Sequence, residues 1–76
     1  MNYVYKLTSS TTITEDGICQ TTFGIAAYKS GESVPCRTIP DIFTSRNEAE
    51  DFIRACNVLE LDIDHLDDVV YDVINA

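Results

Sequence analysis

Apolar and polar side chains alternate along the first thirty residues, and this two-residue period is typical of β-strands. Residues 3–8, YVYKLT, show the alternation, and the SSTTIT run that follows adds β-branched residues that favour extended chain. Residues 18–29, ICQTTFGIAAYK, repeat it, and the side chains on one face of this segment are those of Cys19, Phe23, Ile25 and Ala27. Asp16-Gly17 separates the two segments and favours a tight turn, because glycine tolerates positive φ. The first half therefore predicts a β-hairpin.

A third extended segment follows a second turn at residues 30–32, SGE. It covers residues 33–40, SVPCRTIP. Pro35 has no N–H group for a sheet ladder, so this strand is expected to lie at an edge or to begin after the proline. Pro40 is expected to end it. The three strands together predict an antiparallel meander.

The C-terminal part of the chain changes to the helical period. Ser45 and Glu48 have the spacing of a capping box, which marks a helix start. The apolar face of this first helix consists of Ala49, Phe52, Ile53 and Cys56. Asn57 is expected to end it in a left-handed conformation. A second helix is expected to begin after Asp62 as its N-cap. Its buried stripe is predicted to be Leu66, Val69, Val70, Val73 and Ile74.

These elements predict an α+β fold in which two C-terminal helices pack on one face of the meander, in the order βββαα. Residues 1–76 are expected to form a single domain, since a chain this short builds one small core. No stretch approaches the roughly 20 apolar residues that cross a bilayer, and the start of the chain lacks the features of a signal peptide. Three widely spaced cysteines are typical of free thiols, so a cytoplasmic location is expected.

The net charge of −8 is concentrated in the second half of the chain. Residues 45–76 hold nine acidic residues and two basic ones, whereas residues 1–44 are nearly neutral. Such a surface repels nucleic acid and anionic lipid, and it attracts a basic protein surface. We therefore expect a basic protein partner, and no direct binding to nucleic acid or to a membrane.

A row of carboxylates lies along one side of the predicted second helix. Asp64, Asp68 and Asp72 are spaced four residues apart, about 6 Å along the helix axis. On the first helix Glu50 is expected to pair with Arg54. The candidate partner-binding residues are Glu50, Asp51, Asp64, Asp67, Asp68, Tyr71 and Asp72.

Two interpretations of this row remain open. The pitch resembles the phosphate spacing of one DNA strand, roughly 7 Å along its contour. In the first interpretation, the helix with this row of carboxylates is a nucleic-acid mimic that a nucleic-acid-binding protein would bind. The alternative is a solvated helix face whose surplus charge favours solubility, with Asp51 and Glu48 also unpaired.

Three cysteines and one histidine supply enough ligands for one tetrahedral zinc ion, the candidate cofactor. The candidate ligands are Cys19, Cys36, Cys56 and His65. None of the spacings matches the close ligand pairs of zinc fingers, but Cys56 and His65 flank the connection between the helices, and a metal would stabilise a small domain. The alternative is that the cysteines are small buried hydrophobic side chains. No nucleophile elbow, phosphate loop or dinucleotide fingerprint is present, so we do not expect an enzyme.

Two segments of the chain resemble a family of small bacterial domains of unknown function. They are FGIAAY and CNVLELDIDHLDDVV, residues 23–28 and 56–70. The pattern positions are Cys56, Asn57, His65, Leu66, Asp68, Val69 and Val70. Ile63 stands where the family often has proline, and Cys19 and Cys36 lie outside the pattern. The resemblance implies a fold more than an activity.

Three functional hypotheses follow. By composition alone the chain is similar to small acidic phage inhibitors such as anti-CRISPR proteins, which implies a basic target such as the nucleic-acid groove of a nuclease. The first hypothesis is therefore a non-enzymatic binding module, an inhibitor acting through its acidic helical surface. The second is a zinc-stapled interaction domain that binds through another surface, for example aromatic side chains expected to be exposed, those of Tyr3, Tyr5, Tyr28 and Tyr71. The third is a regulatory subunit or a homodimer joined at an edge strand.

Overall fold

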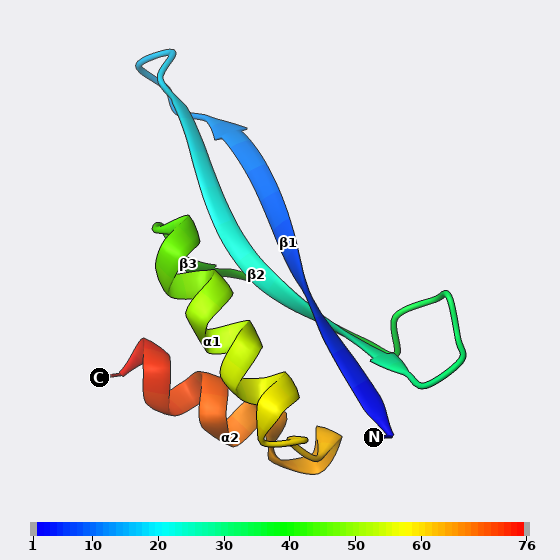
Figure 1. Cartoon of the computed structure of the whole chain (residues 1–76). Helices are drawn as coiled ribbons and strands as arrows, with labels where there is room; N and C mark the ends of the chain where they lie inside the picture. Colours follow the sequence, from blue (N-terminus) through cyan, green and yellow to red (C-terminus); the bar gives the residue numbers. More distant parts are fainter. Residues whose placement is uncertain (1, 76) are drawn as a thin grey trace.

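The computed structural model describes residues 2–75, and these form three strands followed by two helices (Figure 1). The elements are β1 (Tyr3–Ile13), β2 (Cys19–Lys29), β3 (Arg37–Phe43), α1 (Arg46–Val58) and α2 (Ile63–Ile74). The strands form one antiparallel sheet in the order β1-β2-β3. The predicted βββαα architecture is confirmed. No helix within residues 2–75 combines the length and the apolar character needed to span a bilayer.

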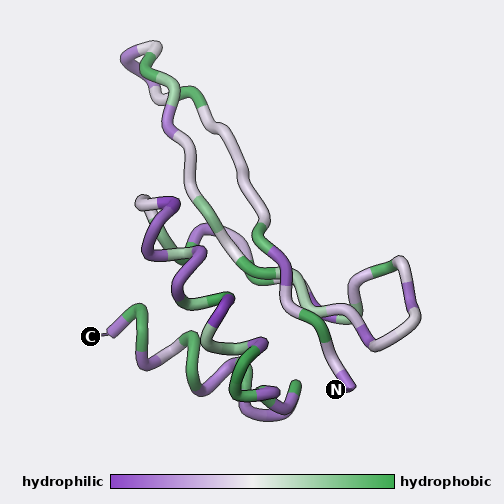
Figure 2. The backbone as a smooth tube through the Cα atoms, viewed as in Figure 1, coloured by the Kyte–Doolittle hydropathy of each residue, from purple (hydrophilic) through white to green (hydrophobic). Residues whose placement is uncertain are grey.

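The core lies between one face of the sheet and the two helices. Tyr5 pairs with Ala27 and Leu7 pairs with Ile25 across β1 and β2, and residues two apart along a strand share a face. The buried residues of the core are Tyr5, Ile25, Ala27, Ile53, Cys56, Leu66 and Val70. Figure 2 shows hydrophilic and hydrophobic positions alternating around both helices, as expected for helices with one buried face.

The third strand does not end at Pro40. β3 begins after Pro35, as predicted, and continues through Pro40 to Phe43. It is an edge strand, where a residue without an N–H group is tolerated. The prediction from Pro35, an edge strand or a strand that begins after the proline, is confirmed. The prediction that Pro40 ends the strand is wrong.

A bulge lies in the part of β3 that follows Ile39. Ile39 pairs with Ile25 and Phe43 pairs with Phe23, so β3 advances four residues while β2 advances two. Gly24 of β2 lies beside the bulge, and a Cβ atom built on it would clash with the carbonyl oxygen of Ile39. A larger residue at this position would force the two strands apart.

Asn57 does not end α1 as predicted. The helix continues to Val58, and Glu60 is the residue with positive φ, 51°. The Oδ1 atom of Asn57 instead accepts a hydrogen bond from the backbone N–H of Tyr5 at 2.8 Å, and its Nδ2 atom donates to the carbonyl of Tyr5 at 2.9 Å. Because β1 is an edge strand, this amide occupies the place of a neighbouring strand and covers one position of the edge.

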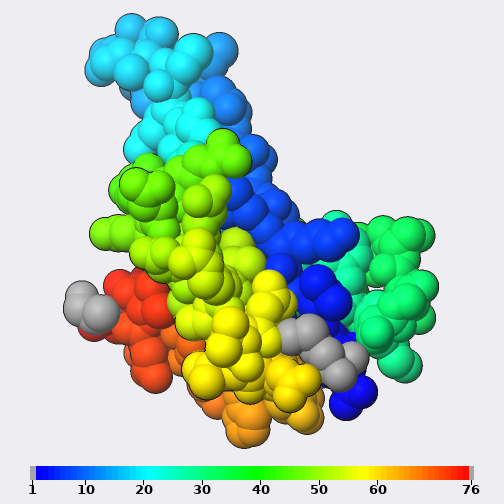
Figure 3. All heavy atoms as spheres, in the orientation of Figure 1, coloured from blue at the N-terminus to red at the C-terminus, as the bar shows by residue number. Residues whose placement is uncertain are grey.

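The far half of the β1–β2 hairpin extends away from the helices (Figures 1 and 3). Residues 9–21 are all exposed, and β3 pairs with β2 between residues 23 and 27. The arm is thus a two-stranded ribbon, rich in serine and threonine, with the hydroxyls of Thr11 and Thr21 3.4 Å apart. The arm contributes surface but no core residues. The core is formed by the two helices and the part of the sheet that they cover.

We predict that Asn57→Ala lowers the free energy of unfolding by about 2 kcal/mol, because two backbone groups of Tyr5 lose their partners at a partly buried position. Urea unfolding followed by circular dichroism measures this. Asn47→Ala, on the exposed side of the same helix, is the matched control and should change stability by less than about 0.5 kcal/mol. Equal losses in the two variants would contradict the role of Asn57.

Candidate partner-binding surface

The hydroxyl group of Tyr5 fixes the connection that leads into α2. Its Oη atom donates a hydrogen bond to the carbonyl of Leu61 at 2.5 Å. Asp62 follows as the N-cap of α2, and its side chain accepts from the N–H of Asp64 at 3.0 Å, as predicted. Leu66 and Val70 then anchor the helix in the core. These contacts determine which side of α2 faces solvent.

Tyr5 is therefore not an exposed aromatic residue, and that part of the sequence prediction is wrong. Its exposed fraction is 2%. Burial raises the pKa of Tyr5 to about 12, and the neighbouring Cys56 and Asp62 add to the effect. The phenol thus keeps the proton that it donates to Leu61. Among the other tyrosines Tyr71 is exposed, whereas Tyr3 and Tyr28 are half-buried.

The three aspartates of the predicted row are exposed along one side of α2. Asp64, Asp68 and Asp72 recur every four residues, and α2 contains no lysine or arginine. Within residues 2–75, no basic side chain forms an ion pair with any of the three. The row is therefore an uncompensated negative surface.

The remaining candidate acids are paired. Asp67 lies 2.6 Å from Arg37 of β3. Glu50 pairs with Arg46 at 3.0 Å instead of the predicted Arg54. Asp51, which the sequence left unpaired, lies 3.8 Å from Arg54. These exposed pairs contribute little to stability. The two pairs on α1 neutralise Glu50 and Asp51, whereas on α2 the pair with Arg37 neutralises Asp67 alone.

The predicted zinc ligands lie in separate parts of the structure. Cys19 is exposed on the hairpin arm, opposite Ile13. Cys36 is exposed before β3, and its Sγ atom donates to the carbonyl of Ala27 at 3.3 Å. Cys56 is buried in the core, and this burial raises the pKa of its thiol. His65 is exposed in the first turn of α2.

The described residues therefore do not assemble the four-ligand site. Among residues 2–75, no group of three or more histidine, cysteine, aspartate or glutamate side chains is placed to hold a metal ion. The alternative reading of the cysteines fits Cys56, which is a small buried side chain, and does not fit the exposed Cys19 and Cys36.

An apolar groove between α1 and α2 was not predicted from the sequence. Its volume is about 250 Å³, and its lining consists of Phe52, Ala55, Cys56, Leu59, Leu61, Val69 and Val73. The predicted buried stripe of α2 is correct for Leu66 and Val70 but too wide, because Val69 and Val73 are half-buried and Ile74 is exposed. The part of the stripe that the sheet leaves uncovered forms one wall of the groove.

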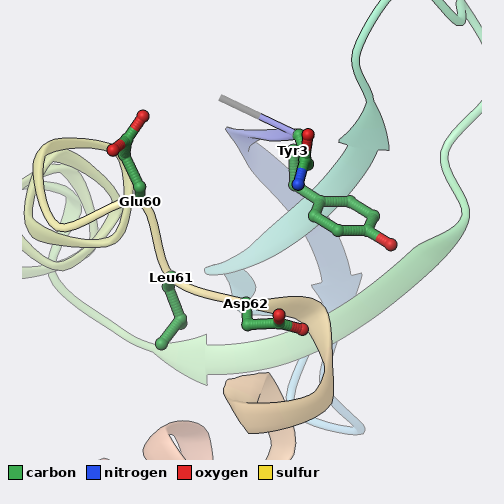
Figure 4. Close-up of a pocket in the computed structure, with 5 residues that line it drawn as sticks. Tyr3, Glu60, Leu61 and Asp62 are labelled. Carbon is green, nitrogen blue, oxygen red and sulfur yellow. The ribbon is translucent and has the colours of Figure 1, made fainter.

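A polar hollow lies at the start of α2, where the chain leaves α1. It has a volume of about 290 Å³ and is lined by Asn2, Tyr3, Glu60, Leu61 and Asp62. Figure 4 shows Tyr3 on one side and the connection from Glu60 to Asp62 on the other. An adjoining hollow of about 480 Å³ extends toward Lys29 and Asp64. The first hollow is mainly polar and the second is mixed, whereas the groove between the helices is apolar.

No protein-family model, curated protein or solved structure matches this chain. The resemblance to the small bacterial domains stays a prediction.

We predict that the stability of the fold falls as the pH rises from about 10 to about 12 because of Tyr5. Its pKa is about 12 in the folded chain and 10.0 for an ordinary tyrosine. In this range the unfolded chain has released the proton and the folded chain still binds it, so alkaline conditions favour unfolding. Tyr5→Phe should remove this dependence and cost about 1 kcal/mol at neutral pH. Urea unfolding of the wild type and of the variant at about pH 9 and about pH 11 measures this dependence. An equal loss of unfolding free energy in both proteins between the two pH values would show that Tyr5 is not the cause.

We also predict that two of the three thiols react quickly with an aromatic disulfide reagent. Cys19 and Cys36 are exposed, whereas Cys56 should react after the chain unfolds in urea. Zinc should leave the fast phase unchanged, because the structure separates the thiols. Protection of both exposed thiols by zinc would revive the metal hypothesis.

Proposed function

We propose that this protein is a non-enzymatic binding module whose aspartate row on α2 docks on a basic surface of another protein. The observation that carries the proposal is the exposure of Asp64, Asp68 and Asp72 on one side of one helix, without a basic partner in the described chain. A carboxylate that is already paired with an arginine of the same chain attracts a basic partner only weakly. These three carboxylates have no such pairing, so their negative charge is available to a partner.

The charge distribution favours rapid encounter with such a partner. The net charge is −8, and the hairpin arm and the sheet contribute little of it. An uneven field of this kind orients an approaching basic surface before contact and raises the association rate. The attraction between exposed charges falls off over a Debye length, about 8 Å at physiological salt. Binding that depends on the row is therefore expected to weaken as salt is added.

The spacing of the row favours nucleic-acid-binding proteins as the partner class. Four residues of α-helix advance about 6 Å, close to the roughly 7 Å between successive phosphates of one DNA strand. Lysine and arginine side chains arranged for phosphates would meet carboxylates at nearly the same pitch. In this proposal the protein competes with nucleic acid for the nucleic-acid-binding groove of an enzyme and thereby inhibits that enzyme.

The other two hypotheses have less support. A zinc-stapled domain needs ligands that meet, and the four candidates lie apart. A homodimer that pairs β1 at Tyr5 would have to displace the Asn57 amide, and a homodimer through either edge strand would bring two chains of charge −8 together.

The row can be tested by neutralising it. We predict that the variant with Asp64→Asn, Asp68→Asn and Asp72→Asn loses basic proteins that the wild-type chain retains in a pull-down at about 50 mM salt, and that about 500 mM salt releases them from the wild type. Quantitative mass spectrometry identifies the retained proteins, and added duplex DNA should compete with them.

A matched control separates the row from net charge. Glu15→Gln, Asp16→Asn and Glu32→Gln remove the same three charges from exposed turns far from α2 in sequence. This control should retain the same proteins as the wild type. Equal loss from both triple variants would show that total charge acts, and equal retention by both would refute the proposal.

A further inference from the structure

We infer that the apolar groove between α1 and α2 receives the apolar face of a basic amphipathic helix from the partner. This inference rests on the proposed function, and it specifies the element of the partner that binds. The groove is lined by side chains of both helices and of the connection between them. It therefore lies on the same half of the molecule as the aspartate row.

The size of the groove fits side chains rather than a small-molecule ligand. Its volume of about 250 Å³ is below the roughly 300–1,000 Å³ typical of small-molecule sites. Leu59, which forms part of its wall, is 77% exposed. In Figure 1, α1 and α2 meet at the connection before α2 and diverge from it. An open apolar groove between two helices accepts apolar anchors spaced at i, i+3 or i+4 on a bound helix.

Carboxylates lie beside the groove on α2. Val69 and Val73 form one row along the helix, and successive residues are turned by about 100°. The row of Asp68 and Asp72 therefore adjoins the valine row. On the other side of the valine row lies Leu66, which is buried in the core. The aspartates thus lie on the solvent side of the valines, where a docked helix would turn its polar flank.

The same arrangement occurs on α1. Phe52 lines the groove, and Glu48 precedes it by one helical turn. Ala55 lines the groove, and Asp51 precedes it by one turn. Both acids are exposed, and residues four apart are neighbours on a helix surface. Asp51 is paired with Arg54, so Glu48 is the α1 carboxylate beside the groove that forms no ion pair within residues 2–75. Together with Asp68 and Asp72 on α2, it places negative charge on both helical walls. A helix with lysine or arginine beside its apolar face is the complement of this groove.

Other occupants fit this charge pattern poorly. A second copy of the chain would place acidic helices against acidic helices, and anionic lipid would be repelled in the same way. The protein itself has five basic residues. Arg37, Arg46 and Arg54 are paired with carboxylates, and the Nζ atom of Lys6 lies 4.9 Å from the ring centroid of Tyr28. Lys29 is the last residue of strand β2. None of the five therefore belongs to a basic amphipathic helix. The complementary helix is thus expected from a different protein.

Three designed peptides test the inference. The first is an amphipathic helix of leucine and lysine with one tryptophan on its apolar face. The second has the same composition in an order that spreads leucine around the helix, and the third replaces lysine with glutamate. The chain contains no tryptophan, so the emission of the peptide reports its own burial. We expect the first peptide to bind with a blue shift, and the other two to bind at least about tenfold more weakly.

Variants of the groove supply the matched comparison. Leu59→Gln removes an exposed wall of the groove and should weaken the first peptide about tenfold. Val58→Gln changes the neighbouring residue, which is 73% exposed and does not line the groove, and should have less than about a twofold effect. Ala55→Arg, at an exposed lining position, should also weaken binding, because it fills the groove and repels lysine. Circular dichroism of each variant verifies folding.

The outcomes separate this inference from the proposed function. If both lysine peptides bind equally and Leu59→Gln has no effect, the acidic surface acts by charge alone and the groove inference is wrong. If the glutamate peptide binds as tightly as the lysine peptide, the groove accepts any apolar helix and the basic partner is wrong. If no lysine peptide binds even at low salt, both proposals fail.

Discussion

The pairing of Asn57 with the backbone of Tyr5 connects the sheet to the helices, and the rest of the helical half depends on it. The side-chain amide holds the last turn of α1 against the edge of β1. The hydroxyl of the same Tyr5 holds the carbonyl of Leu61, one residue before the N-cap of α2. One strand residue therefore fixes the end of the first helix and the start of the second, and these contacts set the direction in which α2 leaves the sheet.

The surface of α2 follows from how little of the helix is buried. Leu66 and Val70 are its buried residues, although its apolar stripe also includes Val69 and Val73. A sheet of three strands, one of them short, leaves part of the stripe uncovered, and that part becomes the wall of a groove. The solvent side of the helix has no basic residue of its own, and Arg37 of β3 reaches Asp67. Apolar and acidic surfaces consequently lie side by side.

The periodic features of the chain were predictable, and the tertiary contacts were not. Alternation along the strands, the cap at Asp62 and the aspartate row depend on neighbours in sequence, and all were predicted from it. The hydrogen bonds of Asn57 join it to Tyr5, which lies 52 residues away in sequence. Its neighbours in sequence indicated only a helix end and could not show this contact. Glu50 has an arginine four residues away on each side, and the period cannot choose between Arg46 and Arg54. Spacing alone likewise could not show that the cysteines lie apart.

In the proposed function, the two surfaces on α2 act at different stages of binding. Exposed carboxylates act over several ångströms and through water, so they govern the rate and orientation of encounter and lose their effect in salt. An apolar groove acts at contact and is much less sensitive to salt, so it governs how long the complex lasts. Asp68 precedes Val69 and Asp72 precedes Val73, so in the proposed function a single approach brings a partner to both surfaces. The carboxylates then act before contact and the groove acts after it.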